Sequence, residues 1–164
     1  DSLIKGVSIS SMFRKSSVEL KIAGGIENQF RAYHQSLLNL IESEGLQEKV
    51  KFIGPVSGEQ KYHTYCDAKF LFLVSNSENF GNVVIEALSQ GTPVVASLGT
   101  PWKGLEDFHA GFWISNSPDE IGKIIDKILS LSEEQYNKYR IAAFSYANTF
   151  NIYSNTECWE NVIK

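Results

Sequence analysis

Short apolar runs alternate with amphipathic stretches along most of the chain. Five runs are rich in β-branched or aromatic residues and are bounded by Gly, Pro, Ser or Asn, which predicts buried strands at 18–24, 49–54, 69–75, 92–97 and 111–115. Because helical periodicity fills the intervals, the pattern predicts βαβ units with right-handed crossovers. We therefore expect an α/β fold with a doubly wound, mainly parallel Rossmann-like sheet and helices on both faces.

Capping signals mark where several of these helices begin. A serine followed three residues later by Gln or Glu is typical of a helix N-terminus, and this pair occurs at Ser57, Ser117 and Ser132. Apolar residues at helical spacing predict the buried faces. These are Tyr62, Tyr65 and Cys66 in one helix, Phe30, Tyr33, Leu37, Leu38 and Ile41 in a helix over 26–44, and Tyr136, Tyr139, Ala143, Tyr146 and Phe150 in the last.

Length, composition and charge fit one ordinary globular domain. The chain has 164 residues, 43% of them hydrophobic and 21% charged, so we expect a single domain over 1–164. The net charge is −4 and the basic residues are scattered, which excludes nucleic acid as an expected partner. The opening DSLIKGVSIS reads as the middle of a helix, so we expect a fragment of a longer protein.

Cysteine usage and hydropathy indicate the compartment. Cys66 and Cys158 lie far apart and lack metal-ligand spacing, so neither a zinc site nor a disulfide framework is expected. The longest apolar run, 70–75, is far shorter than the roughly 20 residues that span a bilayer. We expect a soluble cytoplasmic fragment, while the full-length protein could still associate peripherally with the inner face of the cell membrane.

The stretch SENFGNVVIEAL, residues 77–88, lies where a ligand site is expected. Ligands of parallel sheets bind beyond the carboxyl ends of the strands, and this stretch follows the strand 69–75 and opens a helix. The free N–H groups and dipole of a helix N-terminus attract anions, and Gly81 would let a phosphate approach the backbone. Glu78 precedes this helix end, and Glu86 stands one turn, roughly 6 Å, beyond it. Since carboxylates accept hydrogen bonds from vicinal hydroxyls, a nucleotide sugar fits this layout.

A purely structural interpretation of the same residues is also open. Acidic residues early in a helix stabilise its dipole, and a glutamate in a loop is commonly just solvated. The GxGxxG dinucleotide fingerprint is absent, since only Gly81 is present, so spacing alone does not name the ligand.

A longer stretch carries a family resemblance. SNSENFGNVVIEALSQGTPVVAS, residues 75–97, resembles the signature of group 1 retaining glycosyltransferases of the GT-B fold, in which two glutamates separated by seven residues precede a Gly-x-Pro-Val strand. The resemblance continues in 20–25, 50–56, 64–75 and 99–114. It implies that the chain is the C-terminal, donor-binding lobe of such an enzyme.

The resemblance also implies roles for individual residues. Glu78, the expected catalytic residue, would lie near the donor sugar hydroxyls, and Glu86 would hold the ribose. The sugar pocket and the diphosphate would be bound by the stretch Asn79, Phe80, Gly81, Asn82 and Val83. Room for the donor and contact with its base would come from loops at Gly24, Gly25, Gly54, Pro55 and Val56.

What the family does sets the expected activity. A member would transfer a hexose or N-acetylhexosamine, with retention, from a nucleoside diphosphate sugar to a glycan or lipid-linked acceptor in polysaccharide or lipopolysaccharide biosynthesis. A UDP-linked donor is the first expectation, with no metal or other cofactor. The acceptor would bind through an N-terminal lobe that this sequence lacks, as it lacks the first strand of the donor lobe and the basic pair on it. We therefore expect an inactive fragment with a distorted sheet, a weakened site, or pairing with another chain through its exposed edges.

Two other functions are left open. A non-enzymatic α/β regulatory or interaction domain of the receiver type would carry acidic strand ends, whereas the ends here are Gly24, Gly54 and Ser75. A catalytically inactive relative kept for assembly is the second. Among other side chains, Thr100 and Trp102 could edge the donor pocket or pack the loop. The three histidines, His34, His63 and His109, have no partner at a telling spacing and are expected to be structural.

Overall fold

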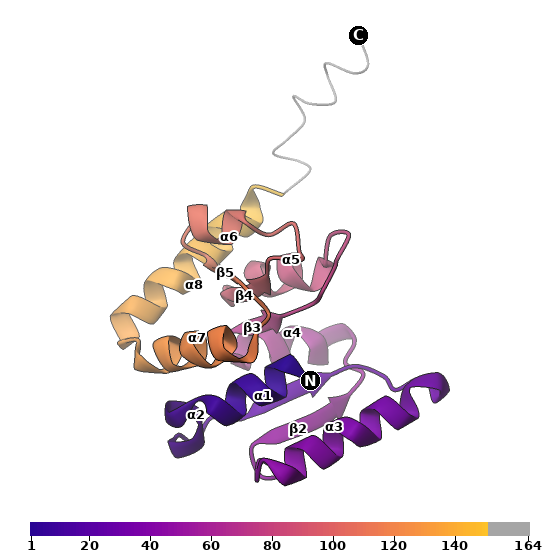
Figure 1. The fold of residues 1–164 in the computed structure, drawn as a ribbon. Coiled ribbons are helices and arrows are strands. Elements are labelled where there is room, and N and C mark those ends of the chain that lie inside the picture. The colour runs from indigo at the N-terminus through magenta and orange to yellow at the C-terminus, as the bar shows by residue number, and fades with distance from the viewer. Residues whose placement is uncertain (151–164) are drawn as a thin grey trace. The chain divides into compact units, whose positions relative to one another are not determined.

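The computed structural model describes residues 1–150 (Figure 1). Contacts divide the chain into two compact units. The first unit consists of Asp1–Lys61 and Ser115–Leu131, and the second of Tyr62–Ile114 and Ser132–Lys164. The expectation of a single domain over 1–164 stays a prediction.

The first unit contains a two-stranded parallel sheet. Strand β1 (Leu20–Ala23) pairs with β2 (Val50–Gly54), and Leu20 lies beside Val50. Its helices are α1 (Ser2–Ile9), α2 (Ser11–Lys15), η1 (Asn28–Phe30), α3 (Arg31–Ser43) and α7 (Pro118–Ser130). Helices α1 and α7 pack closely, because a Cβ on Gly6 would lie only 2.3 Å from Ile121 Cγ2.

The second unit contains a three-stranded parallel sheet with the order β3-β4-β5. Its strands are β3 (Leu71–Leu73), β4 (Val94–Ser97) and β5 (Gly111–Ile114), and its helices are α5 (Asn82–Ser89), α6 (Gly104–Asp107) and α8 (Glu133–Asn148). Helix α4 (Gly58–Asp67) begins in the first unit and ends in the second. The central strand β4 is buried along its whole length, as expected of a strand covered on both faces.

The α/β class with parallel strands is confirmed, and all five predicted strands are present with shorter bounds. Within residues 1–150, the first unit has a sheet of two strands and the second unit a sheet of three (Figure 1). The expected distortion of the sheet stays a prediction.

The helix starts predicted at Ser117 and Ser132 have the expected hydrogen bonds, and the cap predicted at Ser57 stays a prediction. The Ser117 hydroxyl accepts from the Glu120 N–H, and Ser132 and Gln135 form a reciprocal capping box at the start of α8. Helix α5 ends in a Schellman motif, in which Gly91 has φ +70°. The Gly91 N–H donates to the Leu88 carbonyl, and the next N–H, of Thr92, donates to the Ala87 carbonyl.

The buried face predicted for α8 is confirmed. Ala143 and Tyr146 are buried, Tyr136 and Tyr139 pack against Phe70, and Phe150 packs against the buried Trp102. These contacts close the core of the second unit over the β3-β4-β5 sheet.

Two other predicted faces are wrong in part. In α4, Tyr65 is buried but Tyr62 is 53% exposed and Cys66 is exposed, because only a narrow stripe of this helix is covered. In the helix predicted over 26–44, Ile41 is buried and Leu37 half-buried, whereas the exposed side chains are Phe30, Tyr33 and Leu38. A two-stranded sheet offers little surface, so it covers only part of this apolar stripe.

Candidate functional site

The loop between β3 and α5 is tied to the loop that follows β4. The Ser75 hydroxyl donates a hydrogen bond to Glu78 Oε1 over 2.9 Å, and the Ser97 hydroxyl donates to the Ser75 carbonyl. The Glu78 N–H donates to the Gly99 carbonyl at 3.2 Å. A Cβ on Gly99 would lie 2.1 Å from the Asn76 carbonyl oxygen, so the two loops approach each other as closely as glycine allows. The Glu78 carboxylate is therefore held in place by its own loop.

Gly81 turns the chain into α5. It is the N-cap residue and has φ +78°, a left-handed conformation that glycine adopts without steric cost. A Cβ at this position would lie 2.9 Å from Leu73 Cδ2 and 3.4 Å from Trp102 Nε1. Since Gly81 has no side chain to cap the helix, the first turn of α5 presents backbone N–H groups and the positive end of the helix dipole.

Trp102 packs under the connection between β3 and α5 on its core side. Its side chain is 1% exposed, and its indole N–H donates a hydrogen bond to the Phe80 carbonyl. The ring of Phe80 lies 5.3 Å from that of Trp102, centroid to centroid, and is 43% exposed. Of the two interpretations of Trp102, packing is confirmed.

Glu86 is contacted by a tyrosine from a different helix. The Tyr65 hydroxyl of α4 donates to Glu86 Oε2 over 2.9 Å. Burial and, after it, the hydrogen bond to the Glu86 carboxylate raise the pKa of Tyr65, so its hydroxyl keeps the proton that it donates. The sequence places Tyr65 on a buried face but carries no signal for this contact, because the two residues are 21 positions apart.

The second unit brings together one part of the predicted site. Glu78 lies in the loop after β3 and Glu86 in the second turn of α5. The connection between them contains the other candidate positions of this unit, Asn79, Phe80, Gly81, Asn82 and Val83. The roles that the resemblance implies for these residues stay predictions.

The remaining candidate residues belong to the first unit. Gly24 and Gly54 lie at the carboxyl ends of β1 and β2, and the Gly24 N–H donates to the Gly54 carbonyl at 2.9 Å. No heavy atom lies within 4 Å of a Cβ built on Gly24, Gly25 or Gly54. The loop with Gly24 and Gly25 is thus next to the loop with Gly54, Pro55 and Val56, and their predicted roles in donor binding are likewise untested.

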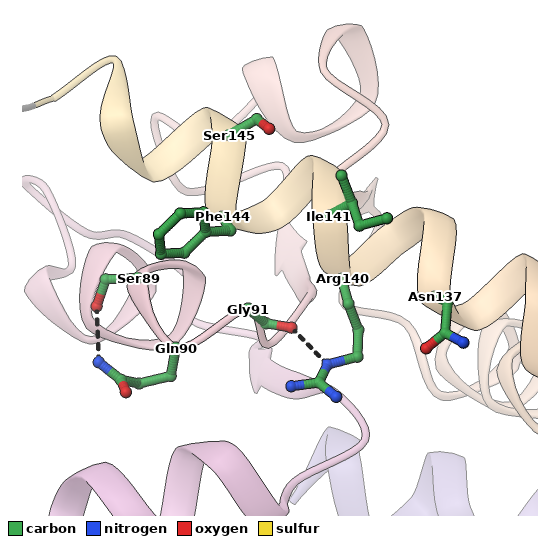
Figure 2. Close-up of a pocket in the computed structure, with 8 residues that line it drawn as sticks. All are labelled: Ser89, Gln90, Gly91, Asn137, Arg140, Ile141, Phe144 and Ser145. Carbon is green, nitrogen blue, oxygen red and sulfur yellow. Dashed lines mark hydrogen bonds between the residues drawn. The ribbon is translucent and has the colours of Figure 1, made fainter.

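A hollow of about 620 Å³ lies elsewhere, at the C-terminal end of α5 (Figure 2). It lies between α5 and α8, where Arg140 Nε donates to the Gly91 carbonyl at 3.2 Å. Its lining consists of Ser89, Gln90, Gly91, Asn137, Arg140, Ile141, Phe144 and Ser145. None of the predicted site residues is among them. Since α5 has 8 residues and is roughly 12 Å long, this hollow is at the opposite end from Gly81.

Among the other side chains that could carry chemistry, the His34 ring packs edge-on against Phe52 at 4.6 Å between centroids, and its Nε2 is buried without a hydrogen-bond partner among the described residues. The structural role expected of His34, His63 and His109 stays a prediction. Within residues 1–150, no group of three or more His, Cys, Asp or Glu side chains could hold a metal ion. In the same part of the chain, no helix has the length and apolar character needed to cross a membrane. Cys158 lies outside the described residues.

Comparisons with known proteins match this chain to glycosyltransferases. A sequence model of the family described as "Glycosyl transferases group 1" matches residues 1–145. The D-inositol 3-phosphate glycosyltransferase of Mycolicibacterium smegmatis is 32% identical over 141 residues, which cover 80% of this chain and 32% of that protein. The chain therefore spans about a third of the length of this curated relative.

Solved structures agree on the fold. Anabaena HepE, crystallised with UDP and glucose, superposes with a TM-score of 0.81 at 21% identity over 98% of this chain and 43% of that one. WaaG, a glycosyltransferase involved in lipopolysaccharide biosynthesis, superposes with a TM-score of 0.78 at 20% identity over 100% of this chain and 43% of that one. At this level of identity the likeness concerns the fold alone.

Proposed function

The chain belongs to the group 1 family of glycosyl transferases, and from this premise we propose that its β3–α5 connection binds the nucleoside diphosphate sugar from which the whole enzyme transfers a sugar. The observation that carries the proposal is the arrangement around α5. Two carboxylates, each held by a hydroxyl donor, flank a helix start that has no side-chain cap.

The diphosphate, the ribose and the donor sugar each have a chemically suitable partner in this arrangement. The N–H groups and dipole at the start of α5, at Asn82 and Val83, suit the diphosphate. Glu86 is suited to accept hydrogen bonds from the vicinal hydroxyls of the ribose, and Glu78 from those of the donor sugar. During transfer the diphosphate leaves with its negative charge, which fixed N–H donors would stabilise more in the transition state than in the bound donor.

The proposal extends to the donor class and to the type of reaction. We take the donor to be a UDP-linked hexose or N-acetylhexosamine, which is supported by the UDP and glucose bound to the structurally similar HepE. Transfer would proceed with retention and without a metal or other cofactor. The acceptor would be a glycan or lipid in polysaccharide or lipopolysaccharide biosynthesis, a choice that the likeness to WaaG supports. Acceptor binding and any association with the inner face of the cell membrane are assigned to the whole protein.

Ligand-observed NMR on the whole protein, with the residues upstream of Asp1 included, tests the donor site. UDP, GDP, ADP and their glucose derivatives are compared on the wild type, Glu86→Ala and the control Glu133→Ala, which removes an exposed glutamate from the start of α8. We expect one nucleoside diphosphate to bind selectively and Glu86→Ala to weaken it about 5- to 150-fold, the scale of a charged hydrogen bond. Equal indifference to all the nucleotides, or equal effects of the two substitutions, would contradict the proposed function.

A further inference from the structure

Tyr65 is held in one position by the core of the second unit. Its side chain is 8% exposed and belongs to the same buried cluster as Val84 and Leu88. The Thr92 hydroxyl donates to the Tyr65 carbonyl at 2.7 Å, and Thr92 is 1% exposed. The phenol therefore reaches Glu86 from a helix that is fixed both by packing and by a buried hydrogen bond.

The phenol is a suitable group for holding a ligand-binding carboxylate. As a neutral donor it leaves the negative charge on Glu86, and a carboxylate has about four acceptor positions, so one donor does not exhaust it. A glutamate side chain that binds a ligand must otherwise give up rotamer freedom at the moment of binding, which weakens affinity. A donor that fixes the carboxylate beforehand removes part of this cost.

From this geometry we propose that Tyr65 is a positioning residue that sets the preference of the site for ribose over 2′,3′-dideoxyribose in the nucleotide. The inference rests on the proposed function, in which Glu86 accepts hydrogen bonds from the ribose. Tyr65 does not touch the donor. It acts by orienting Glu86, so its effect should depend on whether the ligand has the hydroxyls that Glu86 binds.

The test removes the Tyr65 hydroxyl from the protein and the 2′ and 3′ hydroxyls from the nucleotide, separately and together. Dissociation constants of UDP and 2′,3′-dideoxy-UDP are measured by titration NMR on the wild type, Tyr65→Phe and the control Tyr139→Phe. Tyr139 is a half-buried tyrosine of the same unit that packs against Phe70 and Phe112. We expect the wild type and the control to favour UDP about 10-fold, and Tyr65→Phe to reduce this preference to about 2-fold by weakening UDP alone.

The outcomes separate the two proposals. If the wild type does not bind UDP, or binds both nucleotides equally, Glu86 does not recognise the ribose and the proposed function fails. If the wild type prefers UDP over dideoxy-UDP and Tyr65→Phe shows the same preference, only the role of Tyr65 is overturned. A uniform weakening of both nucleotides by Tyr65→Phe would show a purely structural role and would overturn it too.

A second measurement does not depend on the variant folding. With tyrosine labelled at the ring carbon that bears the hydroxyl, UDP should shift the Tyr65 resonance of the wild type, because the carboxylate that it contacts becomes shared with the ribose. Dideoxy-UDP at the same saturation should leave this resonance near its position in the free protein. Identical shifts with both nucleotides would overturn the inference.

Discussion

The indole N–H of Trp102 donates a hydrogen bond to the backbone carbonyl of Phe80, so a buried ring holds the loop that leads into α5. The same ring lies close to Gly81, whose Cβ position is 3.4 Å from Trp102 Nε1. The loop that carries the proposed site is therefore shaped by the core beneath it.

Replacing Trp102 by Phe should destabilise the second unit. The substitution leaves a void in the core and removes the donor to Phe80, and together these should lower the free energy of unfolding by about 1–3 kcal/mol. Urea unfolding followed by circular dichroism measures the change. Trp113→Phe is the matched control, because the Trp113 indole also donates to a carbonyl, that of Thr100 at 3.1 Å, but the ring is only half-buried. A larger loss in the control would contradict the role of Trp102.

Gly81→Ala should be more harmful than Gly91→Ala. Both glycines have a left-handed backbone, with φ +78° and +70°, which costs an alanine about 1–2 kcal/mol in each case. Only at Gly81 would the new methyl group also press on Leu73, since the nearest atom to a Cβ on Gly91 is at an ordinary 3.6 Å. The two midpoints of urea unfolding give the difference directly. Equal midpoints would mean that Leu73 moves aside without cost.

Gly25→Ala separates binding from folding in the first unit. A Cβ on Gly25 meets nothing within 4 Å, and Gly25 has no positive φ, so the free energy of unfolding should change by less than about 0.5 kcal/mol. If the glycine leaves room for the donor as predicted, UDP affinity should still fall. The assay is UDP titration beside urea unfolding of the same variant. Undiminished affinity would remove Gly25 from the predicted site.

Stability should decline at alkaline pH. Burial is the main cause that raises the pKa of four tyrosines, namely Tyr65, Tyr136, Tyr139 and Tyr146. Above the ordinary tyrosine pKa of about 10, the unfolded chain loses these protons before the folded chain does, so unfolding becomes easier as the pH rises. The midpoint of urea unfolding should be flat between about pH 8 and 9 and fall above about 10. Tyr139→Phe should make the fall less steep, and a midpoint that rises with pH would refute this assignment.

The sequence predicts best those features that depend on near neighbours. The strands follow from short apolar runs, and the capping box of Ser132 and Gln135 is encoded within three residues. The loop with Glu78 and the helix with Glu86 are also contiguous in the chain, which is why their order and spacing could be predicted.

Features that depend on distant partners could not be predicted. The burial of Tyr65 but not of Tyr62 depends on which elements cover α4, and the contact of Tyr65 with Glu86 joins two helices. Ser75 gave no sign that it would hold Glu78, because a serine at a strand end has many possible partners. The exposed apolar side chains of α3 show the same limit, since periodicity predicts an apolar face but not what covers it.

The close packing of α1 against α7 has a consequence for any attempt to dissect the gene. Helix α7 follows β5 in the chain but belongs with the N-terminal segment, so the polypeptide passes from one unit to the other at three points. A stop codon after Lys61 would deprive α1 of the helix that Gly6 approaches. Producing the first unit by itself would require splicing codon 61 to codon 115 through a short linker. The matching second unit would require removing codons 1–61 and joining codon 114 to codon 132.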